Sequence, residues 1–248
     1  MSIGQMPFNL EYGDHGVPSE RWATHDLQYA GFLVFQVDHR LAPPNMLPGQ
    51  HTNGEAPAQT DDAKRQILAA LADTQCNGSI YLVGGSAGGC LALWCGLDSA
   101  STVTGWDNNA RLHIKAVVSF SGPTNLDDWS HPDITDYTDF ETRVDNYVGL
   151  IFPDHTHGPL LAASPVNLIT TGAATSSPPV ILVASQYDTV SHTQQDDMVS
   201  ALGSIHASVT YDDFAGSSNH AFCNWHVMDP SGNNCVSTDV INFLYSHP

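Results

Sequence analysis

The chain has 248 residues, of which 42% are hydrophobic and 9% aromatic, values that are ordinary for a globular domain. Seven Lys and Arg residues stand against 26 Asp and Glu residues, which gives a formal charge of −19. Such a surface repels phosphate backbones and anionic lipids, which argues against nucleic acid and membrane partners, and no apolar run approaches the roughly 18 residues of a membrane helix. We expect one soluble domain over residues 1–248 that acts on a neutral or cationic small molecule.

Short apolar runs alternate with amphipathic stretches along the chain, an order typical of an α/β fold with a mostly parallel sheet and helices on both faces. The strands are expected at residues 32–37, 80–83, 114–120, 180–184 and 207–211. The helices are expected to begin at Thr60, after Gly89, at Thr193 and at Ser237. A loop rich in Pro and Gly fills residues 42–59, and the strands that precede residue 32 are expected to be reduced.

Residues 123–178 carry no strong strand signal, although several aromatic residues lie among their Asp, His and Thr residues. An insertion after the carboxyl end of a strand lies where open α/β sheets bind ligands. We interpret it as a small cap within the domain, and a long surface loop with a few core aromatics is the alternative.

The termini and the cysteines bear on the compartment. Residues 1–8 lack the basic and apolar segments of a signal peptide, so either the protein stays inside the cell or the chain begins after a removed leader. The abundance of Ser, Thr and Asn favours an extracytoplasmic habitat on composition alone. Cys76, Cys90 and Cys95 show no zinc-binding spacing, and Cys223 and Cys235 flank a polar loop that either a disulfide or two free thiols would fit.

The run from Gly84 to Gly89 contains GxSxG, with Ser86 at its centre and glycines at both flanking positions. The motif follows a predicted strand and precedes a predicted helix, so the serine lies on a sharp turn where larger flanking side chains would collide with neighbouring strands. This context predicts a nucleophilic serine.

A serine hydroxyl needs a base to remove its proton and an acid to orient that base. In α/β hydrolases the chain order is Ser, Asp or Glu, then His. Asp188 follows the apolar strand at 180–184, and His220 lies in the loop after the last strand, so both leave the same sheet edge as Ser86. We predict that Ser86, Asp188 and His220 form a catalytic triad.

Other titratable residues compete less well for these roles. His192 is expected to begin a helix as a solvated residue, and Asp212 and Asp213 are expected to be turn acids after the last strand. Four histidines precede the elbow and are on the wrong side for the chain order: His15, His25, His39 and His51. Three others fall in the insertion, where they either line the substrate entrance or are exposed loop residues: His131, His155 and His157.

With these residues in place, the chain resembles the small α/β hydrolase esterases that are similar to hormone-sensitive lipase and to feruloyl esterases. The resemblance rests on the DHRLAP segment at residues 38–43 and the GGSAGG elbow at residues 84–89, and it spans roughly Trp22 to the C-terminus. It implies esterase activity on short acyl chains without a metal or an organic cofactor. Asp38 and Arg40 of the first segment are interpreted as a structural ion pair.

The oxyanion hole departs from this pattern. These esterases usually carry an HGG or HGGG loop about 30 residues before DHRLAP, and its backbone amides provide half of the hole. The corresponding positions, Met6 to Leu10, carry no such motif. The backbone amide of Ala87 is the donor that the elbow predicts, and the second donor is unassigned.

The sequence therefore predicts a serine hydrolase that cleaves short acyl or aryl esters through an acyl-enzyme. An amidase or peptidase with the same triad is one alternative, and a catalytically silent hydrolase fold that serves as a binding module is another. An uncovered edge strand would also allow a homodimer.

Overall fold

The computed structural model describes residues 2–6, 18–37, 39–40, 42, 54–128, 138–150 and 153–248. Its centre is a six-stranded sheet with the order β2-β1-β3-β4-β5-β6, in which every pairing is parallel. The strands are β1 (Ser2–Met6), β2 (Leu33–Gln36), β3 (Ile80–Gly85), β4 (Ile114–Phe120), β5 (Val180–Ser185) and β6 (Val209–Phe214). Because all strands run the same way, the loops that leave their carboxyl ends meet at one edge.

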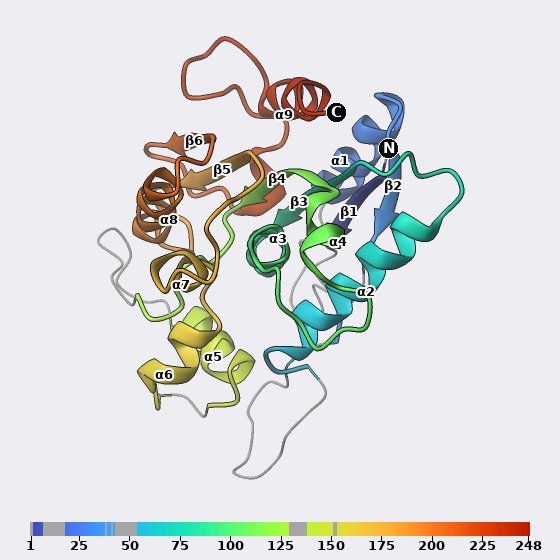
Figure 1. Ribbon diagram of the computed structural model, residues 1–248. Helices are drawn as coiled ribbons and strands as arrows, with labels where there is room; N and C mark the ends of the chain where they lie inside the picture. The colour runs from blue at the N-terminus through green and yellow to red at the C-terminus, as the bar shows by residue number, and fades with distance from the viewer. Residues whose placement is uncertain are drawn as a thin grey trace.

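Helices cover both faces of this sheet (Figure 1). The helices are α1 (Pro18–Tyr29), α2 (Ala58–Ala72), α3 (Ala87–Leu97), α4 (Asn108–Leu112), α5 (Thr138–Tyr147), α6 (His157–Ala162), α7 (Pro165–Thr170), α8 (His192–Ser204) and α9 (Val236–Tyr245), with a 3₁₀ turn η1 (Ala221–Asn224). Alternate residues of β3 point to opposite faces. Ile80 and Leu82 pack in one hydrophobic core with residues of α2, α3 and α8, and Tyr81 and Val83 pack in a second core with residues of α1 and α9. This arrangement confirms the predicted α/β hydrolase architecture.

The strand β1 lies outside the predicted set, which begins the sheet at residue 32. It has only one β-branched residue, Ile3, in the run SIGQM, so its intrinsic strand signal is weak. Its place between two parallel strands supplies the hydrogen bonds, since Ser2 pairs with both Leu33 and Ile80. Met6 pairs with Gly84, which brings the carboxyl end of β1 beside the start of the elbow.

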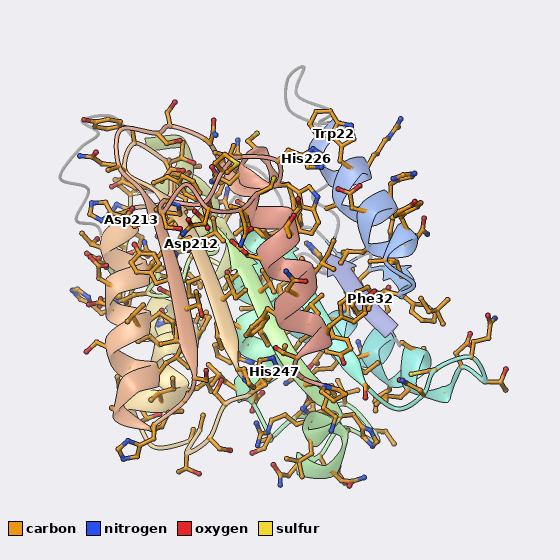
Figure 2. The ribbon with its side chains drawn as sticks, turned by 90° about the horizontal axis from the view of Figure 1, so that it is seen from above. Trp22, Phe32, Asp212, Asp213, His226 and His247 are labelled. Carbon is orange, nitrogen blue, oxygen red and sulfur yellow. The ribbon has the colours of Figure 1, made fainter. Side chains whose placement is uncertain are left out.

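The last strand is longer than expected and corrects the interpretation of Asp212 and Asp213 as turn acids. β6 continues to Phe214, and the two aspartates pair in register with Val183 and Ala184. Figure 2 shows both near the carboxyl end of β6. β6 is an edge strand with a neighbour on one side only, so polar residues can occupy it.

The insertion at residues 123–178 contains α5, α6 and α7 among its described residues. Leu126, Val144, Leu160 and Ala163 form a small hydrophobic cluster separate from the two main cores. In Figure 1, α5 and α6 lie on the side of the sheet that α2, α3 and α7 cover. Residues 129–137 and 151–152 lie outside the described part, so the role of the insertion as a cap stays a prediction.

All five cysteines are free thiols, so Cys223 and Cys235 form no disulfide. The Cys235 thiol instead donates to the backbone carbonyl of Trp225 at 3.5 Å. Within the part of the chain that the structure describes, no helix combines the length and apolar character needed to cross a membrane.

Candidate active site

The nucleophile elbow is built by β3, Ser86 and α3. Ser86 has φ 52° and ψ −122°, a left-handed backbone conformation that residues other than glycine rarely adopt. A Cβ atom on Gly84 would lie 2.2 Å from the backbone carbonyl oxygen of Gly88, so position 84 requires glycine. At Gly84 a larger side chain would therefore collide with the turn itself, whereas the sequence predicted a collision with neighbouring strands.

Hydrogen bonds fix the elbow to the next strand. The amide of Ser86 donates to the carbonyl of Phe120 at 2.7 Å, and the Ser86 carbonyl accepts from the amide of Cys90. Ser86 is 8% exposed. Ala87 is the first residue of α3, where backbone N–H groups have no acceptor within the helix. Its amide therefore lies at the positive end of the helix.

Asp188 and His220 lie together, as predicted. Asp188 is buried in the turn after β5, where Oδ1 accepts from the Val190 amide at 3.1 Å and the Thr189 hydroxyl at 3.2 Å. The Nδ1 atom of His220 lies 2.6 Å from the same Oδ1. A carboxylate only accepts hydrogen bonds, so this contact places a proton on Nδ1, and the neutral form of the ring has its lone pair on Nε2. The His220 side chain is 39% exposed.

The elbow touches the loop that carries His220. A Cβ atom on Gly85, the residue before Ser86, would lie 2.9 Å from Ala221 Cβ and 2.9 Å from the Phe222 ring. Phe222 also packs against Phe120 of β4, with ring centroids 5.2 Å apart. The structure thus brings the turn at Ser86, the turn at Asp188 and the loop at His220 to one edge of the sheet.

The competing histidines have other partners. His192 begins α8 as predicted and lies 3.8 Å from Asp196, while the Nδ1 atom of His39 bonds the Arg40 carbonyl. In the insertion, Nδ1 of His157 lies 2.6 Å from Asp127.

His155 lies on the loop between α5 and α6, and the sequence does not predict a carboxylate partner for it. Its Nδ1 atom is 3.1 Å from Oδ2 and 3.2 Å from Oδ1 of the fully buried Asp145. Asp145 stands ten residues upstream on another element, so no sequence pattern indicates the pair. His15, His51 and His131 lie outside the described residues.

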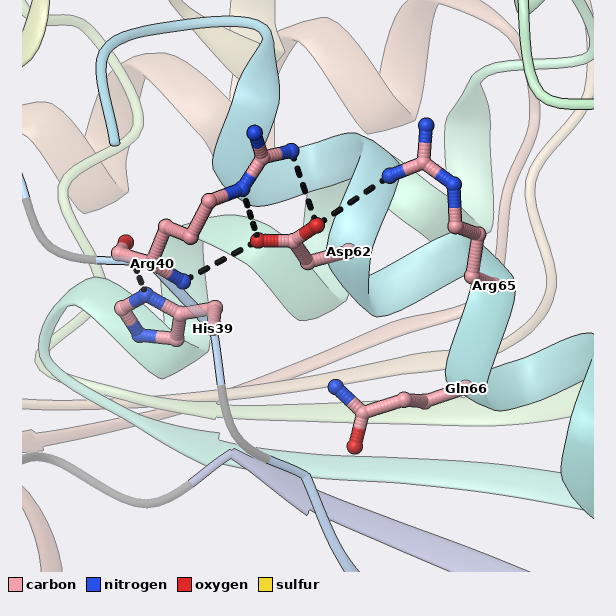
Figure 3. Close-up of a pocket in the computed structure, with 5 residues that line it drawn as sticks. All are labelled: His39, Arg40, Asp62, Arg65 and Gln66. Atoms are coloured by element: carbon pink, nitrogen blue, oxygen red, sulfur yellow. Dashed lines mark hydrogen bonds and ion pairs between the residues drawn. The ribbon is translucent and has the colours of Figure 1, made fainter. Parts of the chain in front are cut away.

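Arg40 pairs with a carboxylate on a neighbouring helix, and its predicted pair with Asp38 stays a prediction. Asp38 lies outside the described residues, and the guanidinium of Arg40 makes two hydrogen bonds with Asp62 of α2, at 2.8 and 2.9 Å (Figure 3). Partial burial opposes ionisation of Asp62, but the hydrogen bonds and charge of Arg40 lower its pKa. A pocket of about 430 Å³ lies over this pair and is also lined by His39, Arg65 and Gln66. Arg65 bonds the same carboxylate at 3.1 Å and lies 3.9 Å from Asp61, so two guanidinium groups face two carboxylates.

The structure describes only part of the residues that could form the oxyanion hole or a metal site. Of Met6 to Leu10, where an HGG loop would lie, Met6 is described and ends β1. Residues 7–17 follow it outside the described part, so the second oxyanion donor stays unassigned. Among the described residues, no group of three His, Cys, Asp or Glu side chains lies together as a metal site would require.

The parallel sheet and the strand–serine–helix turn define the class as the α/β hydrolases. The sequence matches the BD-FAE family over residues 13–202, more than half of the chain, and the protein belongs to that family. The matched region includes Ser86 and Asp188 and ends before His220. A search of curated proteins finds no significant match.

Solved structures share the fold at low sequence identity. A truncated carbohydrate esterase from gut microbiota matches with a TM-score of 0.70 and 18% identity, over 99% of this chain and 84% of that one. An acetyl ester-xyloside bifunctional hydrolase from Caldicellulosiruptor lactoaceticus matches with a TM-score of 0.65 and 19% identity, over 99% and 82%. Esterase 2 of Thermogutta terrifontis, phosphorylated by paraoxon, matches with a TM-score of 0.58 and 17% identity, over 98% and 78%. Family and fold together support the class of carboxylic ester hydrolases.

Proposed function

We propose that the protein is a serine esterase in which Ser86 is the nucleophile, His220 the general base and Asp188 the acid that orients it. The observation that carries the proposal is the 2.6 Å contact between His220 Nδ1 and the buried Asp188, on a loop that touches the GxSxG elbow. A His–Asp pair alone is common, but this one lies at the carboxyl edge where a strained serine begins a helix.

The proposed reaction has two halves. Ser86 Oγ attacks the ester carbonyl carbon while Nε2 of His220 takes the hydroxyl proton, and the carbonyl oxygen gains negative charge that the Ala87 amide stabilises. The bond to the leaving oxygen then breaks, and His220 returns the proton to the departing alcohol. Water repeats these steps on the acyl-enzyme and releases the acid. Asp188 stays ionised, holds the ring in the Nδ1–H tautomer and stabilises the imidazolium.

The proposed substrates are esters with short acyl or aryl groups on a neutral alcohol. The formal charge of −19 disfavours strongly anionic esters. A carbohydrate esterase and an acetyl ester-xyloside hydrolase share the fold, which favours acetylated sugars as the first esters to test.

The test is active-site labelling together with turnover. The wild type should hydrolyse p-nitrophenyl acetate and acetylated xylo-oligosaccharides, and a fluorophosphonate probe should add its phosphonyl group to Ser86, as mapped by mass spectrometry. Ser86→Ala should lose both properties. Ser79→Ala, at the opposite end of β3, is the matched control and should keep both.

The same experiment distinguishes the rival functions. Turnover of acetyl p-nitroanilide at a rate comparable with the ester would favour an amidase. A folded protein with neither labelling nor turnover would support a silent hydrolase fold and overturn the proposal.

A further inference from the structure

The loop that carries His220 has little apolar packing of its own. Between the buried residues Phe214 and Phe222, none of the side chains at 215–221 is buried. The amide of Tyr187 binds the carbonyl of Ser217 at 2.8 Å and holds the first half of the loop against the acid turn. In the second half, which places the imidazole, Ala221 packs against a hydrophobic core, and the other residues are polar, so they depend on polar contacts.

One such contact follows His220 directly. The Ala221 amide donates to the Oγ atom of Ser121 at 3.0 Å, and Ser121 is 1% exposed. Ser121 comes directly after β4, and its own amide donates to the carbonyl of Val183 in β5 at 2.7 Å. Its neighbour Phe120 accepts the amide of Ser86. Ser121 therefore joins the base loop to the strand end that also fixes the nucleophile and to the strand that leads to Asp188.

The second contact precedes His220. The side-chain amide of Asn219 donates to Oδ1 of Asn224 at 3.2 Å, and the side-chain amide of Asn224 donates to Oγ of Ser185 at 3.1 Å. Asn224 and Ser185 are fully buried. Ser185 is the last residue of β5. This chain of hydrogen bonds therefore links Asn219, the residue before His220, to the strand that leads to Asp188.

We propose that Ser121 and Asn224 are positioning residues that hold the His220 loop from its two sides and keep it against the elbow that carries Ser86. The inference rests on the proposed esterase function. Backbone conformation adds to the argument, because Ser121 and Ala221 have φ of 51° and 49°. Two adjoining non-glycine residues in this region are costly, and the hydrogen bond between them stabilises the pair.

The kinetic test separates the Ser121 hydroxyl from its backbone. Ser121→Ala should lower kcat by about 10- to 100-fold with little change in KM, since a small displacement of the base affects the chemical step. Ser121→Gly relieves the strain of the positive φ but also lacks the hydroxyl, so its kcat should fall by the same factor. Ser119→Ala is the matched control, because Ser119 is also fully buried in β4 and its hydroxyl has no hydrogen-bond partner among the described residues. Full activity in Ser121→Ala, or an equal loss in Ser119→Ala, would overturn the role of Ser121.

A second readout does not depend on turnover. The hydrogen-bonded Nδ1 proton of His220 should give a downfield proton NMR resonance in the wild type, assigned by its loss in His220→Ala. Ser121→Ala and Asn224→Ala should shift or broaden it, and Ser119→Ala should leave it unchanged. An unchanged resonance in both loop variants would refute the positioning role. A wild type without ester turnover whose resonance still responds to Ser121→Ala would refute the proposed function and leave the positioning role standing.

Discussion

The molecule contains two His–Asp pairs with similar contacts and different surroundings. His220 and Asp188 join the loops after β6 and β5 beside the nucleophile elbow, while His155 and Asp145 join α5 to the loop that follows it, inside the insertion. In each pair Nδ1 faces a carboxylate that is almost completely buried. The other donors of the two aspartates differ. Asp188 also accepts from Val190 and Thr189, and Asp145 also accepts from the backbone amide of His155. A His–Asp contact alone therefore does not identify a general base, and the proposal for His220 rests on the place of its loop beside the elbow.

The largest expected contrast is between the two histidines. His220→Ala should lower kcat by a factor on the order of 10⁶, as expected when a triad base is removed. Its cost in stability should be small, since Asp188 keeps two other donors. His155→Ala should leave kcat nearly unchanged and destabilise the fold by about 1–3 kcal/mol, because it leaves a buried carboxylate without its ring partner. Steady-state kinetics and urea unfolding measure both effects, and inactivation by His155→Ala would break the comparison.

The second largest contrast in kcat is expected between the two aspartates of these pairs. Asp188→Asn should lower kcat by about 10⁴-fold, because an amide favours the wrong tautomer of His220. Asp145→Asn should leave kcat unchanged. Burial raises the pKa of Asp145, although the charge and hydrogen bonds of His155 oppose the rise. The folded state then binds the Asp145 proton more tightly than the unfolded state, so this contribution to stability is present in acid and is lost as the pH rises through the raised pKa.

The stability of Asp145→Asn should consequently depend less on pH than that of the wild type. Unfolding midpoints measured from pH 4 to pH 8 test this expectation. A wild type whose stability rises with pH because of Asp145 would contradict the expected direction.

A smaller effect on kcat is expected from substitution of two glycines, one that faces the His220 loop and one that follows His155 in the chain. Gly85→Ala places a methyl group 2.9 Å from Ala221 and Phe222, so the base loop must move. We expect kcat to fall by about 10- to 100-fold and stability by about 1–3 kcal/mol. Gly158→Ala in α6 meets nothing within 4 Å and should stabilise the protein by about 0.5–1 kcal/mol with full activity. Equal activities of the two variants would argue against contact between elbow and loop.

The parts that sequence could predict are those fixed by local sterics. GxSxG between an apolar run and a helix specifies the elbow, because a side chain at position 84 would collide with the backbone of residue 88, only four positions later. Asp188 and His220 follow from chain order once the strands are placed, because parallel strands bring their carboxyl ends together.

What sequence could not predict depends on contacts between distant segments. The run SIGQM becomes a strand through pairing on both sides, and Asp62, 22 residues after Arg40, becomes its partner through the packing of α2. Ser121 and Asn224 are ordinary polar residues until the fold sets them around the His220 loop. The pairing of His155 with Asp145 has the same origin.

The smallest effect is expected from Asp212, a half-buried carboxylate near other carboxylates, and it should concern stability and not activity. Asp212 of β6 lies close before the His220 loop, and burial together with the charges of Asp239 and Asp229 raises its pKa to about 6. Because the folded pKa exceeds the ordinary value of 3.8, stability should decline as the pH rises from about 4 through about 6. Asp212→Asn should flatten that decline and raise the melting temperature at pH 7 while kcat stays constant, and Asp213→Asn, exposed beside it on the same strand, is the control. A melting temperature at pH 7 that is lower in Asp212→Asn than in Asp213→Asn would show that the ionised carboxylate stabilises β6 and would remove Asp212 from the comparison.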